Sequence, residues 1–278
     1  MYKIILKEDL VPNVHLLRIE APAIARKAQP GHFIMLRVDE SGERVPMTIA
    51  DWDKDEGSVT VVFLEVGTTT RKLALLETGD SINNVVGPLG IPVHVEKFGT
   101  VVLIGGCYGI GSIFPIARAM KEAGNKVISI IEARSRNLIY WEDRIRSVSD
   151  ELIVIAGDDT YQTKGWVAEK FEEILSDNKV DLAMAIGCTF MMMRSSDMTR
   201  SSGIKTMVHL SPIMVDGTGM CGCCRVSVGG ETRFACVHGP EFDGHQVDWD
   251  LLIARQRAYL GEEIYSLQAF DCQNWQRS

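Results

Sequence analysis

The chain has 278 residues, of which 46% are apolar and 24% are charged, and its formal net charge is -8. These proportions are ordinary for a globular protein, and the length lies near the point where one hydrophobic core gives way to two. An acidic balance without a run of lysines or arginines argues against nucleic acid as a partner. No stretch approaches the roughly 20 apolar residues of a membrane helix, and the N-terminus is charged too early for a signal peptide, so a cytoplasmic protein is expected.

Residues 1–97 are expected to form an antiparallel β-barrel. Short runs rich in Val, Ile, Leu and Thr, separated by Pro, Gly and acidic residues, have the spacing of strands in an all-β domain. These runs are 2–6, 14–19, 33–38, 45–50 and 58–64. The sequence Gly87-Pro88-Leu89-Gly90 is expected to close the domain with a tight turn.

Two stretches of this barrel carry groups that suit a nucleotide. Arg44 and Thr48 lie close together at the strand predicted over 45–50, where a guanidinium can bind a pyrophosphate and a hydroxyl can hydrogen-bond a flavin ring edge. Residues 67–76 open a helical pattern after a strand, and the free N–H groups of a helix start suit a phosphate. Taken singly, the first stretch is more often a solvated strand face and the second a plain Thr N-cap.

Residues 98–210 are expected to form a doubly wound domain with a parallel sheet. An apolar strand at 100–104, a glycine loop at 105–111, a helix at 112–122 and a strand at 126–132 make a βαβ unit. Such a loop lets a dinucleotide pyrophosphate approach backbone N–H groups. Because the glycine spacing is not G-x-G-x-x-G, a simple tight turn is an alternative.

The expected sheet is completed by two further apolar strands, at 151–156 and 182–186. Ligands bind outside the carboxyl ends of such strands, which places a site near Gly106, Asp158 and Cys188. Cys188 could instead be a small buried hydrophobe, and Met191-Met192-Met193 is expected to be helix core.

The residues that follow strand 126–132 bear on the choice of nucleotide. Glu132 could bind a ribose 2′-OH, as in NAD sites, whereas Arg134, Ser135 and Arg136 could hold a 2′-phosphate. The residues alone leave NAD and NADP open.

Residues 211–250 hold four of the seven cysteines, and three of these have the spacing of an iron–sulfur loop. A plant-type [2Fe–2S] loop reads Cys, four residues, Cys, two residues, Cys, and then a distant Cys. Cys221, Cys224 and Cys236 fill the last three positions, and Asp216 stands where the first thiolate belongs. A carboxylate is anionic and can bind ferric iron, so Asp216 is predicted to be the fourth ligand.

The same segment is compatible with three simpler arrangements. Asp216 and Gly217 could form only a turn, Cys223 could be the fourth ligand, or the thiolates could hold a structural zinc. No second cysteine pair has zinc-ribbon spacing, and adjacent Cys223 and Cys224 would have difficulty reaching one metal centre. The odd number of cysteines also argues against a disulfide framework.

Together, the barrel motif at Arg44, Pro46 and Thr48, the glycine loop at 105–111 and the terminal cluster segment resemble the ferredoxin–NADP reductase superfamily along the whole chain. The order of the parts is similar to the electron-transfer subunit of dihydroorotate dehydrogenase and to the small subunit of NADH-dependent reduced ferredoxin:NADP oxidoreductase. The first of these families carries a Cys where this chain has Asp216. The chain therefore resembles the second family more closely.

The resemblance implies FAD on the barrel, NAD(H), or else NADP(H), on the second domain, and a [2Fe–2S] cluster that carries single electrons away from the flavin. The implied FAD-binding residues are Arg44, Pro46, Met47, Thr48, Ile49, Gly67, Thr68, Thr69 and Thr70. The implied nucleotide-binding residues are Gly105, Gly106, Gly109, Gly111, Glu132, Arg134, Asp158, Gly187 and Cys188. The implied cluster ligands are Asp216, Cys221, Cys224 and Cys236. No catalytic acid or base is expected, and Thr48 and Cys188 are candidates to orient the reacting rings.

The resemblance also implies a larger FAD and [4Fe–4S] subunit as partner, so that NADH, ferredoxin and NADP are coupled by electron bifurcation. Residues 251–278, helical and amphipathic in pattern, could dock on that partner or pack on their own subunit. The chain departs from the superfamily in its glycine loop and in the four-residue step from Arg44 to Thr48. A non-enzymatic electron relay or redox sensor is the alternative from a different class.

Overall fold

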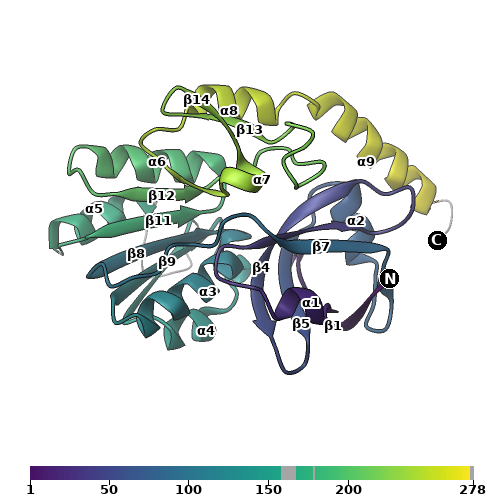
Figure 1. Ribbon diagram of the computed structural model, residues 1–278, viewed down its shortest axis with the longest axis horizontal. Coiled ribbons are helices and arrows are strands. Elements are labelled where there is room, and N and C mark those ends of the chain that lie inside the picture. Colours follow the sequence, from purple (N-terminus) through teal and green to yellow (C-terminus); the bar gives the residue numbers. More distant parts are fainter. Residues whose placement is uncertain (158–166, 178, 276–278) are drawn as a thin grey trace.

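The computed structural model describes residues 1–157, 167–177 and 179–275. Two lobes lie side by side, an antiparallel barrel and an α/β domain, and the C-terminal segment lies over both (Figure 1). The last helix reaches from the α/β side across to the barrel. Asp158, one of the predicted nucleotide ligands, lies outside the described residues.

The first lobe is an antiparallel barrel, as predicted. Its elements are β1 (Tyr2–Val11), β2 (Val14–Glu20), α1 (Pro22–Ala25), β3 (Phe33–Arg37), β4 (Arg44–Asp53), β5 (Ser58–Leu64), α2 (Thr68–Ala74), β6 (Ser81–Ile82) and β7 (Asn84–Leu89). The strand order is β6-β1-β2-β5-β4-β3-β7, and all neighbours are antiparallel. Ile19, Ile49 and Val61 are fully buried inside, because successive strand residues alternate between core and surface.

The predicted turn at residues 87–90 is wrong, because residues 84–89 form strand β7. Strand β7 pairs with β3, with Phe33 opposite Leu89 and Met35 opposite Val86. Pro88 cannot donate a backbone hydrogen bond, but β7 is an edge strand, where a proline is tolerated.

The second lobe is doubly wound, as predicted. Its elements are β8 (Thr100–Gly106), α3 (Gly109–Glu122), β9 (Lys126–Ala133), the 3-10 turn η1 (Arg136–Leu138), α4 (Glu142–Ser147), β10 (Glu151–Ala156), α5 (Val167–Asp177), β11 (Leu182–Ile186), α6 (Thr189–Arg200) and β12 (Thr206–His209). The five strands are parallel in the order β10-β9-β8-β11-β12. Val101 and Leu103 pack with α3 and α4 on one face, and Val102 and Ile104 pack with α5 and α6 on the other. The strand order reverses between β8 and β11, because β9 and β10 are added on one side of β8 and β11 and β12 on the other, and such folds bind ligands at this switch point.

The C-terminal segment is built onto the α/β lobe. It contains β13 (Arg225–Val228), β14 (Glu231–Phe234), α7 (Ala235–His238), β15 (Glu241–Asp243), α8 (Trp249–Gln256) and α9 (Leu260–Trp275). Strand β15 pairs antiparallel with β12 and extends the parallel sheet by one edge strand. Cys224, Cys236 and Phe242 belong to the same hydrophobic core as Val102 and Ile104, so the sheet supports the cysteine segment directly.

Helix α9 contacts the barrel through α2 (Figure 1). Thr68 and Ser266 share a hydrogen bond of 2.9 Å, and Arg71 forms an ion pair with Asp271. Of the two alternatives for the tail, packing on its own subunit therefore occurs at this point, although Ile264 and Tyr265 remain exposed. None of the helices in the described part of the chain has the length and apolar character to cross a membrane.

Candidate functional site

The cysteine segment brings two thiols into contact. The Sγ atoms of Cys224 and Cys236 lie 3.2 Å apart, and both side chains are buried. Cys224 lies just before β13 and Cys236 lies in α7, so the hairpin formed by β13 and β14 sets their spacing. All seven cysteines of the chain are free thiols. Two buried, unlinked thiols at this distance are suited to bind a metal together.

The backbone of the loop points N–H groups at the sulfurs. The amide of Cys223 donates to Cys221 Sγ at 3.5 Å, and the amide of Gly219 donates to the Cys236 thiol. Gly219 and Gly222 have φ values of +86° and +65°, a region that residues with a side chain rarely adopt. Hydrogen bonds to the sulfurs are among the features that set the potential of an iron–sulfur cluster. The loop therefore fits a cluster in both donor type and backbone geometry.

The Cys236 thiol is held in the protonated form. Burial, and then the hydrogen bond with the Cys224 thiol, raise the pKa of Cys236 to about 12. An incoming metal has to displace this proton, because only the thiolate is a ligand. The positive charge of iron would stabilise the negative charge of the thiolate, which the apolar surroundings do not.

Asp216 is ionised and lies at the start of the loop. Its Oδ2 atom accepts hydrogen bonds from the Thr218 hydroxyl and from the backbone amides of Thr218, at 2.9 Å, and Met220, at 3.4 Å. The Thr218 hydroxyl and then the Thr218 amide lower the pKa of Asp216, and the nearby Arg44 guanidinium contributes. Asp216 is thus an anion at neutral pH, the form in which a carboxyl group binds a metal.

The four predicted ligands do not converge on one point. No three Cys, His, Asp or Glu side chains of the described residues are arranged to hold a single metal ion. A two-iron cluster distributes four ligands over two irons, so a single-ion arrangement is not required. The ligand set of Asp216, Cys221, Cys224 and Cys236 stays a prediction, and so does the alternative with Cys223.

Two arginines hold the cysteine loop by its carbonyl groups. Arg225 donates to the Gly222 carbonyl at 3.1 Å, and Arg255, from α8, donates to the Cys223 carbonyl at 3.1 Å. These contacts orient the backbone between Cys221 and Cys224. Neither arginine could be predicted, since nothing in the local sequence pattern distinguishes them from surface residues.

The predicted flavin-binding residues of β4 divide between two faces. Arg44, Pro46 and Thr48 lie at least partly exposed along one face, whereas Met47 and Ile49 are buried in the barrel core. The period of two in a strand explains this division. Side chains of the first three can reach a cofactor on the accessible face, but Met47 and Ile49 could contact it only through the backbone. The cysteine segment packs on the same part of the barrel, because Gly217 lies against Met35 and Leu89.

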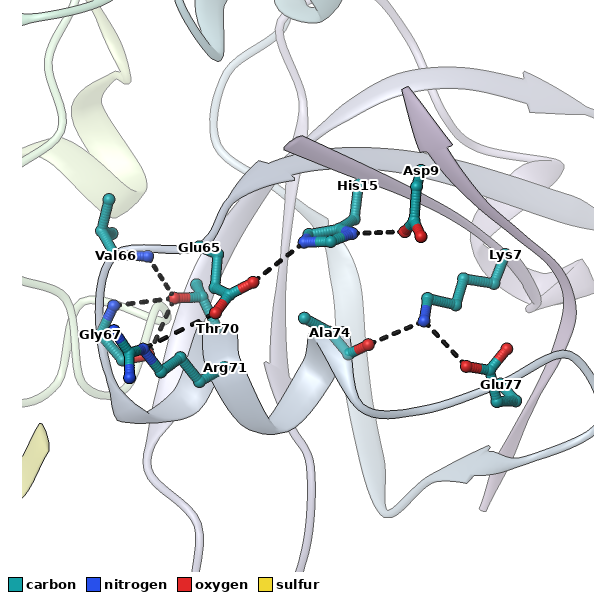
Figure 2. Close-up of polar contacts among 10 residues, drawn as sticks. All are labelled: Lys7, Asp9, His15, Glu65, Val66, Gly67, Thr70, Arg71, Ala74 and Glu77. Carbon is teal, nitrogen blue, oxygen red and sulfur yellow. Dashed lines mark hydrogen bonds and ion pairs between the residues drawn. The ribbon is translucent and has the colours of Figure 1, made fainter. Parts of the chain in front are cut away.

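At the predicted phosphate seat, residues 67–70, the Gly67 amide and the Thr70 hydroxyl form internal hydrogen bonds (Figure 2). The Thr70 hydroxyl accepts from the amides of Val66 and Gly67, both at 2.9 Å, and donates to the Gly67 carbonyl. Thr69 is buried, and Thr68 bonds to Ser266 of α9. The N-cap of α2 is Gly67, and Thr70 bonds back to it from the third helical position, so the plain Thr N-cap expected as an alternative is wrong. The role of this turn toward a phosphate stays a prediction.

A chain of polar contacts fixes this turn to the barrel wall (Figure 2). His15 lies between two carboxylates, with Nδ1 2.6 Å from Asp9 and Nε2 3.2 Å from Glu65. Glu65 in turn pairs with Arg71 of α2 at 3.6 Å. The start of α2 therefore has a fixed position relative to strands β1 and β2.

The glycines of the loop after β8 are required by close packing. A Cβ atom on Gly109 would lie 1.9 Å from the Ile186 carbonyl oxygen, and one on Gly106 would lie 2.6 Å from Met191 Sδ. A Cβ on Gly187 would lie 2.8 Å from the Gly106 carbonyl oxygen. The loops after β8 and β11 therefore approach each other as closely as the backbone allows. They meet at the switch point, where the strand order of the sheet reverses.

Two tyrosines lock this loop. The Tyr108 hydroxyl donates to the Gly187 carbonyl at 2.7 Å, and the Tyr140 hydroxyl accepts from the Gly111 amide at 3.0 Å and donates to the Cys107 carbonyl at 3.1 Å. Tyr108 stands inside the predicted glycine loop, but no sequence signal identifies Tyr140. The Tyr140 hydroxyl adds a second hydrogen bond to the Cys107 carbonyl, which also accepts from the Ile110 amide, so the two tyrosines fix the backbone of both loops.

The remaining predicted nucleotide residues lie around this loop. Cys188 is exposed at the end of β11, and Cys107 is half-buried, with a pKa raised by burial. Burial also raises the pKa of Glu132, at the end of β9. Arg134 follows one residue beyond the end of that strand. Cys188, Arg134 and Glu132 all lie near enough to the Cys107 thiol for their charges to act on it, so these groups gather at the switch point.

The barrel and the doubly wound domain, with accessible groups on β4 and a glycine loop at the switch point, define the fold class of the ferredoxin–NADP reductases, flavoproteins that use a pyridine nucleotide. Comparison with known proteins gives the family. A model for the iron–sulfur cluster binding domain of dihydroorotate dehydrogenase B matches residues 211–248. A Thermotoga maritima protein described as a homologue of the dihydroorotate dehydrogenase B (NAD(+)) electron transfer subunit is 41% identical over 96% of this chain and 95% of its own length.

Two further matches agree with this assignment. An uncharacterized Clostridium beijerinckii protein from the adh 3′ region is 43% identical over 95% of this chain and 92% of its own length. A chain in a solved structure of NADH-dependent reduced ferredoxin–NADP oxidoreductase is 41% identical, with a TM-score of 0.92, over 97% of this chain and 98% of that chain. The chain belongs to the family of the dihydroorotate dehydrogenase B electron-transfer subunit and its homologues.

Proposed function

We propose that this chain is the flavin and [2Fe–2S] electron-transfer subunit of a bifurcating ferredoxin:NADP oxidoreductase, which exchanges a hydride with NAD(H) and passes single electrons to a larger subunit. When bound, FAD divides an electron pair into single electrons, and the cluster carries them one at a time. The observation that carries the proposal is the likeness to the solved oxidoreductase, which spans 97% of the chain.

The proposal gives the residues of β4 and the glycine loop separate tasks. Arg44, Pro46 and Thr48 would hold the flavin, with the guanidinium on its pyrophosphate and the hydroxyl at its ring edge. Cys107 and Cys188, at the switch point, would lie beside the nicotinamide, and Glu132 would bind a ribose hydroxyl. These residues would bind and orient the flavin and the nucleotide, and none of them would transfer a proton.

The cysteine segment would hold the group that transfers electrons from this chain to its partner. Cys221, Cys224, Cys236 and Asp216 would hold the cluster, and the amides of Gly219 and Cys223 would support its sulfur ligands. A larger FAD and [4Fe–4S] subunit is the proposed acceptor, with ferredoxin reached through the complex. Seven free thiols suit a reducing compartment, so we place the complex in the cytoplasm.

The test begins with chain purified without oxygen. Flavin, iron and acid-labile sulfide are quantified, and the protein is then mixed with NADH while the flavin absorbance is followed. Bound FAD, two irons per chain and rapid bleaching are expected. Protein that contains neither flavin nor sulfide would overturn the proposal, and bound flavin that NADH does not bleach would leave only an electron relay.

A second candidate function is electron transfer to a dihydroorotate dehydrogenase. The family model for residues 211–248 and the description of the Thermotoga relative favour it. Asp216 favours the first candidate, because the dihydroorotate family is expected to have a Cys at that position. Purification of the native complex separates the two, since NADP reduction coupled to ferredoxin supports the first and dihydroorotate oxidation supports the second.

A further inference from the structure

Asp51 lies at the contact between the two lobes and pairs with two arginines. It belongs to β4 of the barrel, and its side chain is only 19% exposed. Its Oδ1 atom accepts a hydrogen bond from Arg118 of α3 at 3.1 Å, and its Oδ2 atom accepts one from Arg144 of α4 at 2.6 Å. Both arginines belong to the nucleotide domain, so one carboxylate links two of its helices to the barrel.

Aromatic rings hold both guanidinium groups in place. Arg144 lies 4.1 Å from the Trp141 ring centroid and 4.5 Å from that of Phe114. Arg118 lies 5.2 Å from the Phe114 ring and 5.3 Å from the ring of Trp52, the neighbour of Asp51 on the barrel. Cation–π contacts at these distances restrict side chains that would otherwise be mobile. The two arginines therefore present fixed charges to Asp51.

The backbone of β4 is shaped to direct Asp51 toward the other lobe. The pairing of β4 with β5 has an irregularity between Ile49 and Asp51, where the register changes from Ile49 opposite Val61 to Asp51 opposite Thr60. An extra residue of this kind re-aims the side chains that follow it. The backbone contact is also close nearby, since a Cβ on Gly111 of α3 would lie 3.2 Å from Val62 of β5.

The same two elements carry the proposed cofactor groups. Thr48, a proposed flavin contact, stands three residues before Asp51 on β4, and α3 begins at Gly109, inside the glycine loop. A shift of α3 relative to β4 would therefore change the distance between the two rings that exchange a hydride. Misplacement by about 1 Å can cost such a reaction on the order of a hundredfold in rate.

We propose that Asp51 is a positioning residue that sets the nucleotide loop relative to the flavin strand, by clamping Arg118 and Arg144 against β4. The inference rests on the proposed function, because it needs a flavin on β4 and a nicotinamide at the glycine loop. Without the carboxylate, the guanidinium groups of Arg118 and Arg144 would both face the barrel with no anion between them, and the lobes would separate or rotate there.

Glu142 provides a matched control. Its side chain is 20% exposed, and it also pairs with two arginines, with Arg136 at 2.5 Å and Arg146 at 2.8 Å. All three residues lie within the nucleotide domain. Glu142→Gln therefore removes a carboxylate of similar burial and pairing without touching the lobe contact.

The experiment compares Asp51→Asn and Glu142→Gln with the unchanged holoprotein. In Asp51→Asn, we expect bleaching of the flavin by NADH to slow by roughly ten- to a hundredfold, with the dissociation constant of FAD changed less than about threefold. Amide hydrogen exchange without nucleotide should rise in β4 and at the start of α3. Asp51→Glu, which keeps the charge, should recover most of the rate, and Glu142→Gln should change neither rate nor exchange at the lobe contact.

The outcomes separate this inference from the proposed function. Equal rates and equal exchange in Asp51→Asn and Glu142→Gln would overturn the positioning role while NADH still bleaches the unchanged protein. An unchanged protein that NADH does not bleach would overturn the proposed function and the positioning role with it. If Asp51→Asn does not fold, Arg144→Gln tests the same contact, and a rate equal to that of the unchanged protein would then refute the clamp.

Discussion

Gly217 is expected to be indispensable to the cluster loop for two separable reasons. Its φ is +85°, and a Cβ at this position would lie 2.5 Å from Met35 Cγ and 3.1 Å from Leu89 Cδ1. The left-handed backbone costs a residue with a side chain about 1–2 kcal/mol. Met35 is buried and cannot move into solvent, and forcing an atom into a packed core costs about 1–3 kcal/mol more. Gly217→Ala should therefore destabilise the folded protein by about 2–5 kcal/mol.

Gly230 isolates the backbone contribution. It lies in the turn between β13 and β14 with a φ of +78°, and no atom lies within 4 Å of where its Cβ would be. Gly230→Ala should therefore cost only the backbone strain of about 1–2 kcal/mol and retain the cluster.

The assay is urea unfolding of both variants, together with iron per chain after anaerobic purification. We expect Gly217→Ala to be the less stable variant by about 1–3 kcal/mol and to lose iron, because Asp216 is the adjacent residue. If the two variants have the same stability and the same iron content, the packing of the loop on the barrel plays no part in holding the cluster.

Three further predictions concern the cluster ligands and the pH dependence of stability. Cys221→Ala should lose the cluster and Cys223→Ala should keep it; iron and sulfide analysis decides, and the reverse pattern would make Cys223 the ligand. Asp216→Cys should keep the cluster with a shifted potential in a redox titration, and an Asp216→Ala variant with unchanged spectrum and potential would remove the carboxylate from the ligand set. Burial lowers the pKa of His32, so the folded protein favours the neutral ring. The contribution of this ring to the free energy of unfolding is therefore complete above the ordinary pKa of about 6.5 and is lost as the pH falls below it. His32→Gln should make the melting temperature less sensitive to acid in this range, and an unchanged pH profile would contradict this.

The barrel and the parallel sheet could be predicted because their strands are long enough to show a pattern. The strand predicted at 58–64 is β5, and the strand predicted at 182–186 is β11, both with the same bounds in the structure. Strand β15 has only three residues, two of them acidic, and forms because β12 offers it an edge. A pattern of period two cannot be recognised in so short a segment.

The cysteines of the site could be found from spacing, but the contacts between distant segments could not. Asp51 is separated by 67 residues from Arg118 and by 93 from Arg144, so no local pattern joins them. The placement of α9 has the same origin, since Arg71 and Asp271 are 200 residues apart. Only the fold determines which charged side chains of distant segments pair with one another. No single stretch of the sequence contains both members of such a pair.

In the proposed function, electrons enter this chain as a pair and leave it singly through the cluster. Rapid freezing after anaerobic mixing with NADH, followed by electron paramagnetic resonance, tests it directly in the purified chain. We expect the signal of a reduced [2Fe–2S] cluster to grow as the flavin absorbance falls, and to be missing in Cys221→Ala although the flavin of that variant still bleaches. A flavin that bleaches in the unchanged chain while an intact cluster stays oxidised would contradict the claim.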